Sequence, residues 1–115
     1  MPTRTGLLQM WRLIQGRENM TAYLLVDHDI HDQTIFQEFR SKIPALIAKH
    51  CGEFIVRGGA FEVIEGDLMP HFLVILRFPD RQAIQKFLSD PEYLTISATR
   101  SCAAKTVSIA VDGIS

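Results

Sequence analysis

The sequence predicts an α+β protein in which elements in the order β-α-β-β-α-β form one four-stranded antiparallel sheet. Three observations lead to this fold class. Apolar, β-prone runs alternate with amphipathic helical segments, the chain reverses only once between the two middle runs, and one of these runs is apolar on both faces. We expect one domain over residues 20–115, preceded by a leader over residues 1–19 that is flexible or forms a short helix.

The first half of the domain reads as strand, helix and strand. Residues 22–30, "AYLLVDHDI", form an apolar run that ends in acids and predicts the first strand. Asp32 can cap the following helix, in which apolar residues recur at three- and four-residue steps and Pro44 should introduce a kink. Gly52 ends this helix, and "EFIVR" (residues 53–57) resumes β-strand character.

The adjacent glycines Gly58 and Gly59 decide the topology. A tight hairpin at this pair would reverse the chain here and again at residues 65–70, so the next strand would run parallel to the first. A bend or bulge would let the strand continue to Glu65 and leave one reversal, at residues 66–70. We favour the bend, because glycine within a strand commonly marks such an irregularity.

The second half repeats the order strand, helix and strand. Residues 71–78, "HFLVILRF", form a strand with almost no polar alternation. Asp80 caps the next helix, and Asp90 followed by Pro91 begins a short third helix. The alternating run "KTVSIAV" (residues 105–111) supplies the last strand.

Helices can cover only one face of this sheet, yet the strands are apolar on both. In the third strand Val74, Leu76 and Phe78 point one way, and Leu73 and Ile75 point the other. A bare face of this kind would be a large exposed apolar patch, so another subunit should cover it. The sequence therefore predicts a homodimer with two sheets packed face to face.

Composition excludes several kinds of partner. The net charge is −1 and there is no basic run, so we expect no nucleic acid. No apolar run approaches the roughly 20 residues that span a bilayer, so we expect no membrane. Cys51 and Cys102 lack metal-ligand spacing, and we expect reduced, buried thiols in a cytoplasmic protein. Asp27, Asp29 and His31 share one strand face but match no metal signature, so we expect no metal and no cofactor.

Several short motifs, taken in their order and spacing, resemble the DUF1330 family. They are "AYLLVD" at 22–27, "VRGG" at 56–59, "EGD" at 65–67 followed by Pro70, "FP" at 78–79 and "PEY" at 91–93. The resemblance covers residues 21–112 and implies a small bacterial protein with the dimeric α+β-barrel form of the ferredoxin-like fold. It also implies a pocket between sheet and helices that could hold a small molecule. His28 stands where this family usually has an apolar residue, and His71 near where it tends to carry arginine.

Arg57 is the leading candidate for a ligand-binding residue. Its guanidinium can bind a carboxylate or a similar anion through two parallel hydrogen bonds. Gly58 and Gly59 would let a ligand or another backbone approach closely. The alternative is a structural ion pair of Arg57 with Glu62 or with an aspartate of the first strand.

Five further residues are candidates for binding or catalysis. Tyr23 and Tyr93 could hydrogen-bond a ligand through their hydroxyls, or serve packing alone. Arg100 is the arginine that the last helix retains from the basic site implied by the resemblance. His71 could act as a general acid or base, with Asp27 as the second catalytic candidate, or could be exposed and inert.

Three functions stay open at this point. The first is a homodimer that binds a small molecule, with an anion as the ligand that Arg57 would suit. The second is a cofactor-free enzyme of the monooxygenase or isomerase type, and the third is a purely structural dimer. A pocket lined by Arg57, Asp27, His71 and Tyr93 together would favour the enzyme. A narrow, closed, apolar interior would favour the structural role.

Overall fold

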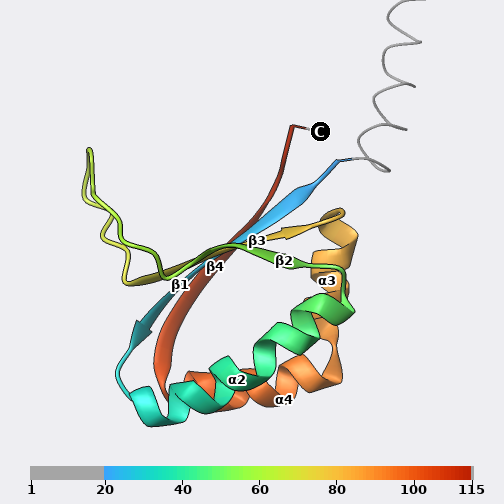
Figure 1. The fold of residues 1–115 in the computed structure, drawn as a ribbon, viewed down its shortest axis with the longest axis horizontal. Coiled ribbons are helices and arrows are strands. Elements are labelled where there is room, and N and C mark those ends of the chain that lie inside the picture. Colours follow the sequence, from blue (N-terminus) through green and yellow to red (C-terminus); the bar gives the residue numbers. More distant parts are fainter. Residues whose placement is uncertain (1–19, 115) are drawn as a thin grey trace, which may run out of the picture.

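The computed structural model describes residues 20–114, so the predicted leader over residues 1–19 lies outside the described part of the chain. The elements are β1 (Ala22–Ile30), α2 (Gln33–Lys49), β2 (Glu53–Arg57), β3 (Phe72–Phe78), α3 (Arg81–Ser89), α4 (Pro91–Ser101) and β4 (Ala104–Asp112). The four strands pair antiparallel in the order β2-β3-β1-β4. The helices lie together on one side of this sheet (Figure 1). The predicted α+β class and strand arrangement are confirmed.

The helix starts follow from local capping. The carboxylate of Asp32 accepts a hydrogen bond from the backbone N–H of Ile35 at 3.0 Å, and Asp80 accepts one from Ala83 at 2.8 Å. Asp90 accepts one from Glu92 at 2.8 Å at the start of α4. These three caps are the ones that the sequence predicts, because each needs only residues close in the chain.

Asp90 also joins α2 to the start of α4. Its carboxylate lies 2.7 Å from Nε2 of His50 and 3.0 Å from Nζ of Lys49, both at the end of α2. These hydrogen bonds, from His50 first and then Lys49, hold the pKa of Asp90 well below its usual range. Two of the helices that cover the sheet, α2 and α4, are therefore tied together at one end.

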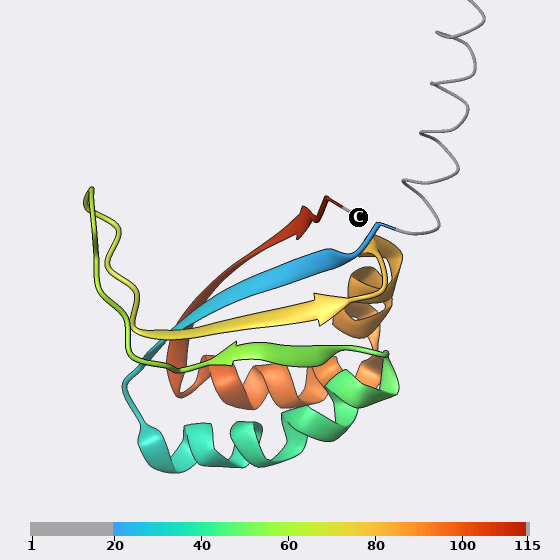
Figure 2. The same cartoon turned by 45° about the horizontal axis from the view of Figure 1, so that its top comes forward.

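The core lies between the two layers that Figure 2 shows, the sheet and the helices. Val74, Leu76 and Phe78 of β3 are buried on the helix side, whereas Leu73 and Ile75 face the other way and stay half-buried, as predicted. The largest fully buried side chains are Phe78, Phe87 and Ile84. Burial of this apolar surface is the main term that stabilises the fold.

The face of the sheet away from the helices, here called the open face, is also apolar. Registry places Leu25 of β1 between Ile75 of β3 and Ile109 of β4 on this side. Val107 and Ile109 are 63% and 62% exposed, and Val111 is 45% exposed. Exposed β-branched residues at alternate positions of β4 form the bare patch that the sequence predicts.

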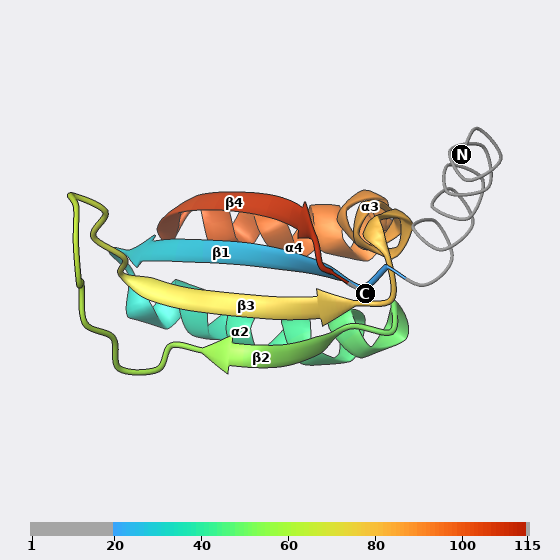
Figure 3. The same ribbon diagram turned by 90° about the horizontal axis from the view of Figure 1, so that it is seen from above.

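The segment after β2 differs from the prediction. The strand ends at Arg57 and does not continue to Glu65, because residues 58–71 leave the sheet as a long loop, here called the arm (Figure 3). The tight hairpin is excluded too, since β2 and β3 are antiparallel neighbours with a single reversal. Gly58 has a φ of +67° and starts the departure, and its N–H donates to the carbonyl of Leu73 at 2.7 Å.

Two residues, Cys51 and Gly52, terminate α2, whereas the sequence suggests Gly52 alone. Cys51 takes the left-handed conformation, with a φ of 65°, and its N–H donates to the carbonyl of Ala48. Gly52 is needed for space, because a Cβ there would lie 2.6 Å from Cε1 of Phe78 and 2.9 Å from Cγ2 of Ile47. Cys51 and Cys102 are free thiols, but both are exposed rather than buried.

Replacing these two residues should change stability in opposite directions. We expect Cys51→Gly to raise the free energy of unfolding by about 0.5–1 kcal/mol, because glycine adopts a positive φ without steric cost. Gly52→Ala should lower it by about 1–3 kcal/mol, because the methyl group overpacks the buried ring of Phe78. Urea unfolding of both variants checks this; a stabilised Gly52→Ala protein would contradict the account.

Candidate functional site

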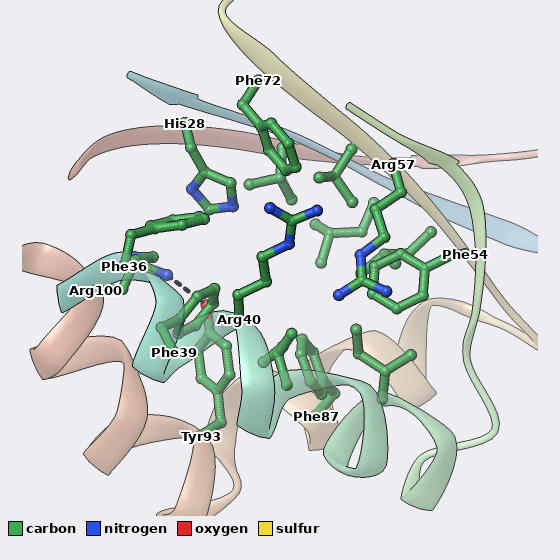
Figure 4. A pocket seen from close by; sticks show the side chains of 16 residues that line it. His28, Phe36, Phe39, Arg40, Phe54, Arg57, Phe72, Phe87, Tyr93 and Arg100 are labelled. Carbon is green, nitrogen blue, oxygen red and sulfur yellow. Dashed lines mark hydrogen bonds between the residues drawn. The ribbon is translucent and has the colours of Figure 1, made fainter. Parts of the chain in front are cut away.

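A cavity of about 50 Å³ lies between the helix side of the sheet and the helices (Figure 4). Aromatic rings make most of its wall, and its polar side chains are one histidine and three arginines. The aromatic residues are Phe36, Phe39, Phe54, Phe72, Phe87 and Tyr93; the polar ones are His28, Arg40, Arg57 and Arg100. No acidic side chain is among the described residues that line it. The wall of the cavity is therefore mostly apolar, and its charged groups are all positive.

Arg57 reaches this cavity because of a bulge in β2. In a regular strand, Phe54 and Arg57 would point to opposite faces. The ladder pairs Phe54 with Leu76 but Arg57 with Val74, so that Ile55 is an extra residue without a partner. Both partners on β3 are buried on the helix side, and so Phe54 and Arg57 lie on that side together. The sequence places the irregularity at the glycines, whereas the structure places it at Ile55.

Each arginine of the cavity lies over an aromatic ring. The guanidinium carbon of Arg57 is 4.4 Å from the centre of the Phe54 ring, and that of Arg40 is 5.2 Å from the Phe72 ring. Arg100 lies over Phe39 at 5.8 Å. Such stacking holds a cation in place and leaves its N–H groups free to bind a ligand. Figure 4 shows Arg40 and Arg57 extending between the rings.

None of these three arginines has a carboxylate within 4.0 Å among residues 20–114. Arg100 donates from its Nη1 to the hydroxyl of Tyr93 at 2.9 Å, while its buried Nε has no hydrogen-bond partner in the described structure. A buried donor without a partner is costly, so this Nε–H can donate a hydrogen bond to a group that enters the cavity. The ion pair of Arg57 with Glu62 or an aspartate, the alternative to a ligand-binding role, is not formed among the described residues.

His28 is the histidine of this cavity, and its side chain is buried. Its Nδ1 lies 2.8 Å from Oγ1 of Thr106 on β4, and its ring packs edge-on against Phe36 at 5.0 Å. Burial, and then the positive charge of Arg100, lower the pKa of His28 from 6.5 to about 4, although Asp27 acts in the opposite direction. The imidazole is therefore neutral at pH 7.

Two of the polar lining residues were not among the sequence candidates. Arg40 lies one helical turn after the buried Phe36, so the helical period could have placed it on the same face of α2 as Phe36. His28 alternates with Leu24 and Val26, which puts all three on the helix side of β1. Arg57, Tyr93 and Arg100, which the sequence does single out, are brought together here.

The two catalytic candidates meet elsewhere. Nδ1 of His71 lies 2.9 Å from one carboxylate oxygen of Asp27, and the backbone N–H of His71 donates to the other at 2.7 Å. The hydrogen bond to Asp27, aided by the charge of Asp29, raises the pKa of His71. The pair lies on the open face, since Asp27 pairs with Leu73 on that side. Asp27, His71, Arg57 and Tyr93 therefore do not share one pocket.

The other candidates also lie outside the cavity. Tyr23 is on the open face, beside Arg77 and opposite Val111. A Cβ on Gly58 would lie 2.3 Å from the ring of Phe72, so this glycine permits a close approach between arm and sheet. Gly59 has open space around it, and the constraint expected for both glycines therefore applies to Gly58 alone.

Within residues 20–114, no group of three or more His, Cys, Asp or Glu side chains is placed to hold a metal ion. None of the described helices has the length and apolar character needed to cross a membrane.

The architecture defines the class of protein: a ferredoxin-like α+β domain, with a four-stranded antiparallel sheet covered by helices on one face. The family model named "Domain of unknown function (DUF1330)" matches residues 21–114, and the chain belongs to this family. The resemblance drawn from the motifs is thus confirmed. A search of curated proteins found no match.

Solved structures share this fold at low sequence identity. A protein of unknown function from Rhodopseudomonas palustris has a TM-score of 0.67 at 13% identity, covering 95% of this chain and 93% of that chain. SnoaB, a cofactor-independent oxygenase from Streptomyces nogalater, has a TM-score of 0.58 at 12% identity, covering 84% and 95%. A dimeric ferredoxin-like protein of unknown function from Bacteroides fragilis has a TM-score of 0.53 at 14% identity, covering 81% and 94%. At these identities the likeness shows the fold.

The depressed pKa of His28 makes stability depend on pH. Between about pH 4 and pH 6.5 the unfolded chain binds a proton at this residue and the folded chain does not. The contribution of His28 to the free energy of unfolding is therefore complete above pH 6.5. As the pH falls toward 4, this free energy decreases by on the order of 3 kcal/mol. Urea unfolding across this range should show that His28→Gln removes this slope.

An NMR titration of the imidazole rings tests the same assignment by a second measurement. His28 should stay neutral down to about pH 4, whereas His71 should keep its proton to a pH above the ordinary 6.5. A titration of His28 near 6.5 would contradict its burial as a neutral ring.

Proposed function

We propose that this protein binds a small organic anion, with an apolar and planar body, in the cavity between the sheet and the helices. The observation that carries the proposal is the set of three guanidiniums without a carboxylate partner among residues 20–114, in a cavity with aromatic walls. Like charges that line one small cavity repel one another, and a bound anion would relieve this repulsion.

The lining supports an anion that carries a planar body, such as an aromatic carboxylate. A planar guanidinium binds a carboxylate through two parallel hydrogen bonds, and six aromatic rings offer contact to an aromatic or unsaturated body. The cavity of about 50 Å³ has room for only a few water molecules. A ligand larger than this must move Arg40 or Arg57, the two arginines that extend between the rings. Arg40 and Arg57 would then reach their ligand-bound positions only when the anion binds.

We also propose that the protein is a homodimer whose subunits pack by their open faces. The exposed Val107, Ile109 and Val111 support this, because a soluble monomer seldom leaves so apolar a sheet face uncovered. The dimeric ferredoxin-like protein from Bacteroides fragilis shows that this fold occurs in dimers. The cavity lies on the opposite side of the sheet, so the two surfaces do not compete.

Cofactor-free catalysis is a second candidate, favoured by one observation. A neutral His28, hydrogen-bonded to Thr106, shares the cavity with the cationic Arg100, so a group that could accept a proton stands near groups that stabilise an anion. SnoaB, which has the same fold, is a cofactor-independent oxygenase. Recovery of a bound compound unchanged after incubation in air would favour the binding function.

Removing Arg57 should weaken anion binding with little effect on folding. We expect benzoate to raise the melting temperature of the wild type and benzamide, its neutral isostere, to leave it unchanged. In Arg57→Ala the dissociation constant for benzoate, measured calorimetrically, should rise roughly ten- to a hundredfold, as for lost hydrogen bonds to a charged group. The control is Arg81→Ala, another exposed arginine, which lies outside the lining of the cavity. Equal effects of benzoate and benzamide would contradict the proposal.

A charge in the open face should separate the subunits. Ile109 lies opposite Leu25 near the middle of this face, so Ile109→Glu would bury a carboxylate in the interface. We expect light scattering at micromolar concentration to give a dimeric mass for the wild type and a monomeric mass for this variant. Leu94→Glu, on the exposed side of α4, is the control. A monomeric wild type would refute the homodimer.

A further inference from the structure

The arm, residues 58–71, carries five large apolar residues that are exposed, whereas the described helices carry one, Leu94. Ile64 and Leu68 are 82% and 80% exposed, and Met69 is 64% exposed. Phe61 and Val63 are also exposed. Scattered apolar residues on a surface need no explanation, but five of them within nine residues of one projecting loop do.

The arm is fastened only where it joins the sheet. Gly58 donates to the carbonyl of Leu73 at one end, and Asp27 accepts hydrogen bonds from the backbone and the ring of His71 at the other. No hydrogen bond from the backbone of residues 59–70 to another backbone group is formed within the described structure. The conformation of the arm is therefore set by its two attachments and not by a ladder of its own.

The arm projects on the side of the sheet that faces away from the helices (Figures 1 and 2). This is the side of the open face, and the attachment between Asp27 and His71 lies on the same face. Two sheets packed face to face stand about 10 Å apart. A subunit packed on the open face would therefore lie beside the arm, within reach of its apolar side chains.

The charges of the arm argue against a lipid surface. Glu62, Glu65 and Asp67 lie among the apolar residues, and no Lys or Arg lies between Gly58 and His71. Anionic membranes attract basic segments and repel acidic ones. Continuity with the open face instead favours a protein surface, that of a second copy of this chain.

We propose that the arm packs against the second subunit of the dimer, with Ile64, Leu68 and Met69 as its principal contacts. This inference rests on the proposed homodimer and adds to it a contact outside the sheets. The arm begins directly after Arg57 and ends directly before Phe72, two residues that line the anion cavity. Docking of the arm on the partner therefore restrains both of these positions, and the dimer supports the binding site.

The test compares the double variant I64S/L68S with Leu94→Ser in the full chain. Ile64 and Leu68 are more exposed than Leu94, which is 56% exposed on α4 and away from the open face. Because none of the three belongs to the core, all variants should keep the wild-type circular dichroism spectrum. Sedimentation equilibrium should give at least a tenfold larger dimer dissociation constant for I64S/L68S and no change for Leu94→Ser.

Three outcomes would overturn the inference. If I64S/L68S dimerises like the wild type while Ile109→Glu is monomeric, the sheets form the interface without the arm, and the homodimer stands. If the wild type is itself monomeric, the homodimer and the arm contact both fail. If the wild type co-sediments with phosphatidylcholine–phosphatidylserine vesicles and I64S/L68S does not, at equal dimerisation, the arm binds membrane instead.

Discussion

The candidate site depends on a single irregularity of the sheet, the extra residue at Ile55. This bulge turns Phe54 and Arg57 to the same side of β2, where the guanidinium stacks on the ring and both line the cavity. Without it, strand alternation would place Arg57 on the open face, among the apolar residues that we assign to the subunit interface. The same bulge keeps Val56 on the open face, beside Ile75. One inserted residue thus places Arg57 on the side of the sheet where we propose the anion site and Val56 on the side where we propose the subunit interface.

Charge is distributed in the cavity without internal neutralisation. Guanidiniums stacked on aromatic rings keep much of their affinity for an anion, since a ring shields one face and leaves the N–H edge free. His28 adds no further positive charge, because burial and Arg100 keep it neutral. The acids of the first strand, which might have paired with these arginines, lie on the open face, where Asp27 and Asp29 surround His71. The sheet therefore separates a positive cavity from an acidic cluster.

Much of the fold follows from local signals in the sequence. The caps at Asp32, Asp80 and Asp90 and the bounds of β1 depend on residues close in the chain, and all are predicted correctly. The bulge and the arm depend on the pairing between strands, which is not a local signal. The composition after Gly58 is strand-like, and it does not reveal that this segment has no strand to pair with. Strand alternation alone predicts that His28 lies on the helix side of the sheet and that Tyr23 and Asp27 lie on the open face.

The most direct measurement is an NMR titration of the arginine side-chain Nε–Hε resonances with benzoate. If the cavity binds organic anions, the resonances of Arg57 and Arg100 should shift together, with one dissociation constant, because both line the same space. Arg77, on the open face and paired with Glu53, should not move. Shifts confined to Arg77 and Arg81, with Arg57 and Arg100 unchanged, would contradict the assignment of this cavity as an anion site.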